Sequence, residues 1–415
     1  MPDRHLPVRP RLDQLEHQAR ELLRALQLGD EAAVAEFQRN HPRPPIAAAA
    51  TLSDAQLALA RSYGLPSWHR GVLACRMTDA ICRDEVEAVR QLILQHPALL
   101  HEDARGVQGN WGPPMSYAAN LGRDRIIEML HERGAEDVQF AFERACLQGE
   151  IETARLLFGK GARPVDGSVM GPCETLSPSG LELQLELGAR FCDEHGDRLA
   201  PAGLVLETYC RNPHGKHECL NIIERLGIEF PDTAPMAVHR GRIDLLERLV
   251  DRDPSLLTAS FAHEEMFPRA VGCSGDPACA LCGTPVVGGT LLHMCVEYSE
   301  LDIARWLIAR GADVNARAAV DADGFGGHTA LFSCVVTQPP ITLRDSDIFT
   351  RLLLDHGADP NVCASLRKRL IGAHDETEHE YRDVTPLSWG DRFHDRSFVS
   401  EPAMRLIAEL VDGSQ

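Results

Sequence analysis

The segment from Thr290 to Arg317, TLLHMCVEYSELDIARWLIARGADVNAR, constrains the fold more than any other part of the sequence. It predicts a short helix opened by Thr-x-Leu-His, a second helix, and a turn that begins at a glycine. The second helix has one apolar face, formed by Ile303, Ala304, Leu307 and Ile308. Gly311 follows this helix, where a left-handed C-cap favours glycine. A helix pair this small cannot bury its apolar face alone, so the sequence predicts that such pairs stack.

Related patterns recur along the 415 residues and predict an all-α solenoid of about eight units, several of them degenerate. The second helix and its glycine ending locate the units at about 84–96, 113–135, 137–162, a unit closing at Gly188 and Ala189, 198–230, 234–257, 290–317, 327–362 and 384–411. Units between about 165 and 235 have lost most of the pattern, and the last three fit it best.

The motifs TLLHMC, GHTALFSC, VTPLSW, RGADVNA and HGADPNV carry a family resemblance. From about residue 70 onward the chain resembles bacterial ankyrin-repeat proteins. The resemblance implies an ankyrin-repeat solenoid that acts as a protein–protein interaction scaffold, binding its partner through hairpin-edge loops and the concave helix face. It also implies that His293, at the Thr-x-Leu-His position, holds neighbouring loop backbone in place and is structural.

The domain organisation follows from where this pattern starts, fades and is interrupted. Residues 1–70 are expected to form a helical N-terminal cap, with Asp30 and Ser53 capping two of its helices. Degenerate repeats are expected over 71–257, a cysteine-containing insertion loop over 258–289, and well-formed repeats over 290–415 with an insertion at 363–383.

Composition limits the function and the location of the protein. The formal net charge is −19, from 61 acidic and 42 basic residues, which repels phosphate backbones and anionic membranes. We therefore expect no nucleic-acid or membrane partner, and a basic protein as the partner. No run reaches the roughly 18–20 apolar residues of a membrane span, and the N-terminal residues lack an apolar signal core. Thirteen cysteines, mostly in apolar helical patterns, predict reduced buried thiols and a cytoplasmic protein.

Three segments are longer than a minimal repeat requires: 258–289, 336–347 and 363–383. Extra loop on a rigid scaffold is where function is usually located. The first and the third are expected to lie at the hairpin edge, side by side and outside the stacked core. Partner-binding residues are predicted there at Glu264, Phe267, Arg269, Asp276, Arg367, Glu376, Glu378 and Tyr381.

A metal-binding protein or metal-dependent enzyme is the alternative interpretation. Cys273, Cys279 and Cys282 lie close in sequence, and Cys-x-x-Cys spacing lets two thiolates bind one tetrahedral zinc. Additional ligands are expected among His263, Cys295, His374 and His379. An unligated or oxidisable cysteine loop remains the competing interpretation. The acidic stretch HDETEHEY, at 374–381, is either a weak metal or docking site or simply a solvated loop.

No sequence motif indicates catalysis. The chain lacks a Gly-x-Ser-x-Gly elbow, a phosphate-binding Gly-x-x-x-x-Gly-Lys loop, a dinucleotide fingerprint and a His-Glu-x-x-His zinc helix. A Cys–His pair formed only by folding stays open, but the sequence singles none out. We therefore predict no catalytic residues and no organic cofactor, and favour a non-enzyme.

Overall fold

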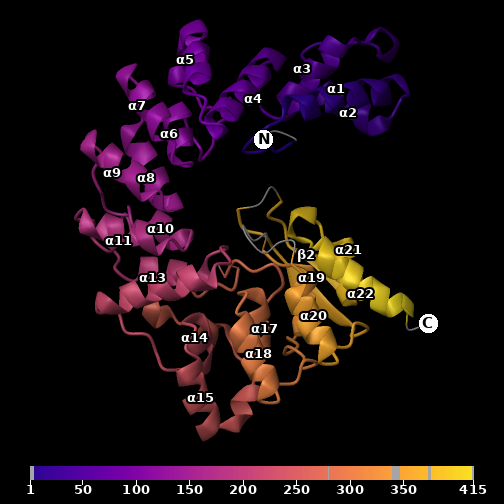
Figure 1. The fold of residues 1–415 in the computed structure, drawn as a ribbon. Coiled ribbons are helices and arrows are strands. Elements are labelled where there is room, and N and C mark those ends of the chain that lie inside the picture. Colours follow the sequence, from indigo (N-terminus) through magenta and orange to yellow (C-terminus); the bar gives the residue numbers. More distant parts are fainter. Residues whose placement is uncertain (1–3, 279, 339–345, 373–374, 414–415) are drawn as a thin grey trace. The chain divides into compact units, whose positions relative to one another are not determined.

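The fold is a series of short helix pairs, shown in Figure 1 by a computed structural model that describes residues 4–278, 280–338, 346–372 and 375–413. Contacts between Cα atoms divide the chain into unit 1, Met1–Pro164, and unit 2, Val165–Gln415. In the described residues the strands β1 (Ala364–Lys368) and β2 (His379–Val384) form the one sheet. The all-α solenoid class is confirmed, with this hairpin added.

The N-terminal part of unit 1 has its own apolar core. Its elements are α1 (Leu12–Gln27), α2 (Glu31–Asn40), η1 (Ala47–Ala49) and α3 (Leu52–Ser62). Leu15, Leu22, Phe37 and Leu59 are buried between them. Asp30 caps α2 as expected, since its Oδ1 accepts the Ala33 amide at 2.9 Å. Ser53 was the wrong cap for α3: Thr51 is the cap, because its hydroxyl and the Asp54 carboxylate form a reciprocal capping box.

The rest of unit 1 consists of three stacked helix pairs. They are α4 (Trp68–Cys82) with α5 (Val86–Gln95), α6 (Pro114–Ala119) with α7 (Asp124–Glu132), and α8 (Val138–Gln148) with α9 (Ile151–Gly159). The turn η2 (Pro97–Leu100) follows α5. Helix α6 packs between α4 and α8, so the first helices of successive pairs lie side by side.

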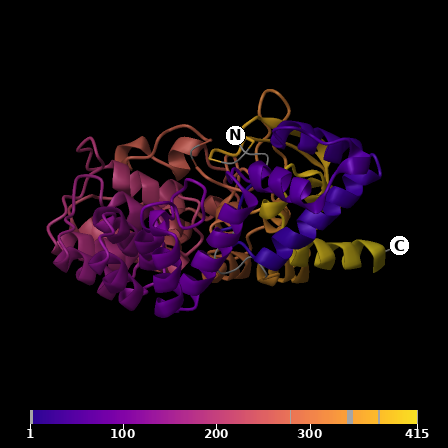
Figure 2. The same cartoon turned by 90° about the horizontal axis from the view of Figure 1, so that it is seen from above.

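Unit 2 contains six helix pairs. They are α10 (Met170–Glu174) with α11 (Pro178–Glu186), α12 (Ala200–Glu207) with α13 (Pro213–Arg225), α14 (Ala234–His239) with α15 (Ile243–Arg252), α17 (Leu291–Glu297) with α18 (Leu301–Ala309), α19 (Ala330–Val335) with α20 (Ile348–Asp355), and α21 (Pro386–Arg392) with α22 (Glu401–Gly413). Short elements between them are η3 (Pro254–Leu257), α16 (His263–Met266), η4 (Arg269–Val271) and η5 (Arg396–Phe398). Figure 2 shows α22, in yellow, at the C-terminal end of this unit. The described residues thus hold nine helix pairs, one at each of the nine ranges that the sequence indicated, against the expected total of about eight units.

The repeat at 290–317 has the predicted structure. Ile303, Ala304 and Leu307 are buried on one face of α18, and Gly311 adopts a left-handed φ of +93° after it. Asn315 joins this turn to the next one: its amide group donates to Gly357 O at 2.8 Å, and its Oδ1 accepts the Asp359 amide at 2.7 Å. Backbone of successive turns is therefore held in register by one side chain.

Two buried histidines also connect neighbouring repeats. His293 Nδ1 accepts the Thr290 amide at 3.1 Å, and its Nε2 lies 3.1 Å from His328 O. His328 Nε2 in turn lies 2.8 Å from Pro285 O. Burial lowers the pKa of His293 to about 4 and that of His328 to about 3, so both rings are neutral. The structural role implied for His293 is confirmed.

Two predictions from composition can be examined directly. No cysteine of the described part forms a disulfide, and most of these thiols are buried. Among the described helices, none combines the length and the apolarity needed to cross a lipid bilayer.

Candidate functional site

The insertion 258–289 belongs to the core of unit 2, which corrects the expectation that it lies outside the stack. Met266 and Phe267 are fully buried, and Val271, Cys273 and Cys282 nearly so. The error arose because the segment is rich in Gly, Pro and Asp, whereas its two phenylalanines and its methionine are buried. Shortening this insertion would therefore remove core.

Backbone contacts anchor the insertion to α12. A Cβ at Gly203 would lie 2.0 Å from Gly272 O, so glycine is required for this close approach. The Ser274 amide donates to the Glu207 carboxylate at 3.0 Å, and the Leu281 amide donates to Glu207 O at 3.0 Å. One helix end thus holds both arms of the cysteine-containing loop.

A buried ion pair lies beneath this loop. Arg211 Nη2 is 3.0 Å from Glu297 Oε1, and the side chains are 1% and 0% exposed. Arg211 also donates to Leu281 O at 2.7 Å, while the same Glu297 oxygen accepts the Gly283 amide at 2.8 Å. Burial raises the pKa of Glu297, and the Arg211 charge opposes that effect. The pair therefore fixes the loop to α17 at the cost of desolvating two charges.

A second polar group is buried beside the ion pair. Lys216 Nζ lies 2.7 Å from His239 Nδ1 and 4.1 Å from the centre of the Tyr298 ring. His239 Nε2 is 3.1 Å from Met266 O, so the histidine donates there and accepts from Lys216. Burial lowers the pKa of Lys216 to about 7. This network ties α13, α14 and the insertion together.

The insertion 363–383 forms the hairpin β1–β2. Leu366 pairs with Tyr381 and Lys368 with His379 across the antiparallel strands. Alternation along β1 turns Ala364, Leu366 and Lys368 inward and Arg367 outward. Arg367 binds Asp321 at 2.6 Å and Asp323 at 3.1 Å in the preceding loop, which holds the hairpin against the neighbouring repeat.

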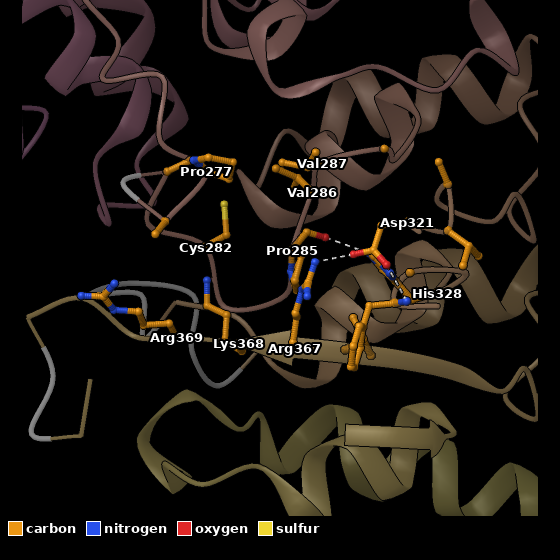
Figure 3. Close-up of a pocket in the computed structure, with 18 of the residues that line it drawn as sticks. Pro277, Cys282, Pro285, Val286, Val287, Asp321, His328, Arg367, Lys368 and Arg369 are labelled. Carbon is orange, nitrogen blue, oxygen red and sulfur yellow. Dashed lines mark hydrogen bonds and ion pairs between the residues drawn. The ribbon is translucent and has the colours of Figure 1, made fainter. Parts of the chain in front are cut away.

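A cavity of about 390 Å³ lies where the two insertions meet (Figure 3). The expectation that they lie side by side is therefore confirmed. Apolar walls come from both insertions and from the loop before α19: Pro277, Pro285, Val286, Val320, Phe325 and Leu366. Polar groups on the walls include Cys282, His328, Lys368, Arg369 and Glu378. The volume falls at the lower end of the range of small-ligand pockets.

Lys368 is the exceptional group in this cavity. The residue is 8% exposed, and within the described residues its Nζ has no hydrogen-bond partner. Figure 3 shows the amine pointing across the cavity towards Cys282. Burial lowers the pKa of Lys368 and raises that of the Cys282 thiol, whose Sγ lies 3.5 Å from the Tyr298 hydroxyl.

The predicted metal ligands are not gathered into one centre among the residues that can be placed. Within the described ranges, no three His, Cys, Asp or Glu side chains form a group able to hold a metal ion. His379 instead lies 2.8 Å from Asp375 and stacks on His394, and the His263 ring lies tilted against the Phe267 ring. Cys279 and His374 lie outside the described residues, so a zinc site that depends on them stays a prediction.

The predicted partner-binding residues fall into two groups. Phe267 is fully buried and Tyr381 is 4% exposed, so both are core residues and their assignment to a partner surface is corrected. The Tyr381 ring packs edge-on against Trp389 with centres 4.7 Å apart. The other six residues carry charge at accessible positions: Glu264, Arg269, Asp276, Arg367, Glu376 and Glu378.

The buried charged residues were missed from the sequence. Arg211, Lys216, Glu297 and Lys368 carry no motif, and charge usually indicates a solvent-facing position. One signal was present for Lys368, because strand alternation within SLRKR places it on the same face as Leu366. That signal needed the strand to be recognised first.

Comparison with known proteins supports the repeat assignment over a short stretch. The family model of the ankyrin repeat matches residues 287–319, the segment that contains α17 and α18. No curated protein matches the chain. Among solved structures, the human ASB11 ankyrin repeat domain is similar at 18% identity and a TM-score of 0.24, over 71% of this chain and 97% of that one. Residues 287–319 are thus an ankyrin repeat within a chain of stacked helix pairs.

Proposed function

We propose that the protein is an interaction scaffold of the ankyrin-repeat type, which binds a partner protein through its hairpin edge and the concave helix face. Ankyrin repeats serve generally as protein-binding modules, and the matched repeat at 287–319 lies directly before the hairpin repeat. The observation that carries the proposal is the hairpin β1–β2, which exceeds what a repeat needs for stacking and presents charged side chains outward.

Exposed glutamates gather at the turn between β1 and β2 and at the start of β2, where Arg382 pairs with one of them, Glu380, at 3.0 Å. We define the hairpin edge as Glu376, Glu378 and Glu380, all of which are exposed. Their carboxylates, together with the net charge of −19, favour a partner that is basic on the matching surface. Free, buried thiols among the described cysteines support a reducing compartment, and we place the protein in the cytoplasm.

Site-specific photocrosslinking tests the proposal. A photoreactive phenylalanine analogue is placed at Glu378 and, as a matched control, at Glu247, an exposed glutamate on α15. In intact cells we expect the Glu378 position to give one discrete crosslinked protein and the Glu247 position to give none of it. The same product from both positions, or none from Glu378, contradicts binding at the hairpin edge.

A further inference from the structure

The position of Lys368 results from strand geometry. Side chains alternate between the faces of a strand, and Ala364 and Leu366 occupy the inward positions before it. An apolar residue would satisfy this position, yet it is occupied by a lysine that is only 8% exposed. Lysines are almost never this buried unless they are paired.

Among the residues that the structure describes, no carboxylate forms an ion pair with Lys368. Glu297 is the carboxylate whose charge acts on Lys368, but its Oε1 is bound by Arg211 and by the Gly283 amide. Its Oε2 is buried without a partner, and no hydrogen bond joins it to Lys368 in the described part of the chain. A buried ammonium without a partner is costly, so the site gains stability from an added anion.

The other charged groups on the cavity wall do not fill this need. Asp321 is bound by Arg367, and Glu378 is exposed at the hairpin edge. Arg369 is exposed, lines the cavity, and has no hydrogen bond or ion pair within the described residues. Basic groups therefore outnumber acidic ones on the wall, although the whole chain is acidic.

The remaining wall restricts what can carry the anion. Val286, Val320, Phe325 and Leu366 line the cavity, so an ion with a complete hydration shell is a poor match. A volume of about 390 Å³ accommodates one or two amino-acid side chains. The matching ligand has a carboxylate next to an apolar group.

We propose that this cavity binds a short acidic peptide segment, with a carboxylate on Lys368 Nζ and an adjacent apolar side chain against Val286 and Val320. The inference rests on the proposed scaffold function and identifies how one segment of the partner is held. Such a segment is compatible with a basic partner, because Glu376 and Glu380 of the hairpin edge are not among the residues that line the cavity. The carboxylate is that of an Asp or Glu side chain or of a chain terminus, and the test separates the two.

Lysine labelling makes the site directly observable, because the chain has three lysines only: Lys160, Lys216 and Lys368. Protein labelled with carbon-13 at the lysine Cε is titrated with N-acetyl-Leu-Glu-amide, with N-acetyl-Gln-Leu bearing a free C-terminus, and with neutral N-acetyl-Leu-Gln-amide. We expect a saturable shift of the Lys368 signal with at least one carboxylate peptide, no such shift with the neutral peptide, and no change at Lys160.

The signals are assigned by the loss of one resonance in Lys160→Arg, Lys216→Arg and Lys368→Met, so assignment survives if one variant does not fold. In the Lys368→Met variant, neither remaining signal is expected to respond to the acidic peptides. An equal response to neutral and acidic peptides, or no response at Lys368, overturns the inference. Crosslinking at Glu378 reports capture of a partner whether or not a carboxylate binds Lys368, so failure of this site and failure of the scaffold proposal are distinguishable.

Discussion

The insertions 258–289 and 363–383 interrupt the same row of repeats, yet they are built on different principles. The first has few turns of helix and is held by buried polar anchors at Arg211, Glu207 and Lys216. The second is a regular hairpin whose inner face packs and whose outer face stays charged. The sequence of each insertion predicts a polar loop. Contacts with the core, rather than composition, therefore decide whether an insertion becomes part of the folded scaffold or remains an exposed surface loop.

Removing the charge of Arg211, which anchors the first insertion, should cause the largest loss of unfolding free energy. Arg211→Met leaves Glu297 buried without its cation, and we expect a loss of roughly 3–5 kcal/mol in unfolding free energy. The double variant Arg211→Met with Glu297→Leu should recover part of this loss, because no uncompensated charge remains. Urea unfolding followed by circular dichroism measures both.

The matched control is Arg225→Met, which breaks the exposed pair with Glu182 and should cost at most about 1 kcal/mol. A loss below that size in Arg211→Met would show that the ion pair does not hold the insertion.

Lys216 tests the same anchor through pH. Its pKa is lowered from 10.5 to about 7 in the fold, so between these values the unfolded chain binds more protons than the folded one. Stability due to this group therefore rises with pH from about 7 to about 10.5, by at most roughly 4 kcal/mol. We expect Lys216→Met to lose this rise.

The measurement is the urea midpoint of the wild type, Lys216→Met and Lys160→Met at pH 7 and at pH 9.5. The groups around Lys216 include Arg211, His239, Tyr298 and Glu300, and they are common to all three proteins. An identical pH response in the wild type and Lys216→Met would contradict the burial of a titrating amine.

Substitutions at the hairpin edge should have the smallest effect on the unfolding free energy. Glu376→Ala and Glu378→Ala remove exposed side chains, of which Glu376 accepts the Gly372 amide at 2.8 Å and Glu378 borders the cavity. Each should change the unfolding free energy by no more than about 0.5 kcal/mol, because neither side chain is buried. Thermal unfolding of the two variants beside wild type checks this. A larger loss would mean that the second insertion is also part of the scaffold, and the contrast between the two would disappear.

The repeats could be predicted from sequence because their signals are local. The apolar spacing in α18, Gly311 after it and the Asp30 cap each depend on residues within a few positions. The candidate site could not be predicted from sequence, because it depends on contacts between residues far apart in the chain. Arg211 and Glu297 are 86 positions apart, and Lys368 acquires its meaning only when β1 folds over the cysteine-containing loop. Phe267 was misplaced for the same reason.

The hydroxyl of Thr284 reaches further along the chain than repeat architecture requires. It donates to Val336 O at 2.6 Å and accepts from Trp389 Nε1 at 3.1 Å, although two whole helix pairs separate Thr284 from Trp389. Solenoids usually unfold from one end, because each repeat contacts only its immediate neighbours. Because the Thr284–Trp389 bond bypasses the two helix pairs in between, it couples the unfolding of the terminal pair to that of the segment before α17. These last helix pairs should therefore unfold together rather than one after another.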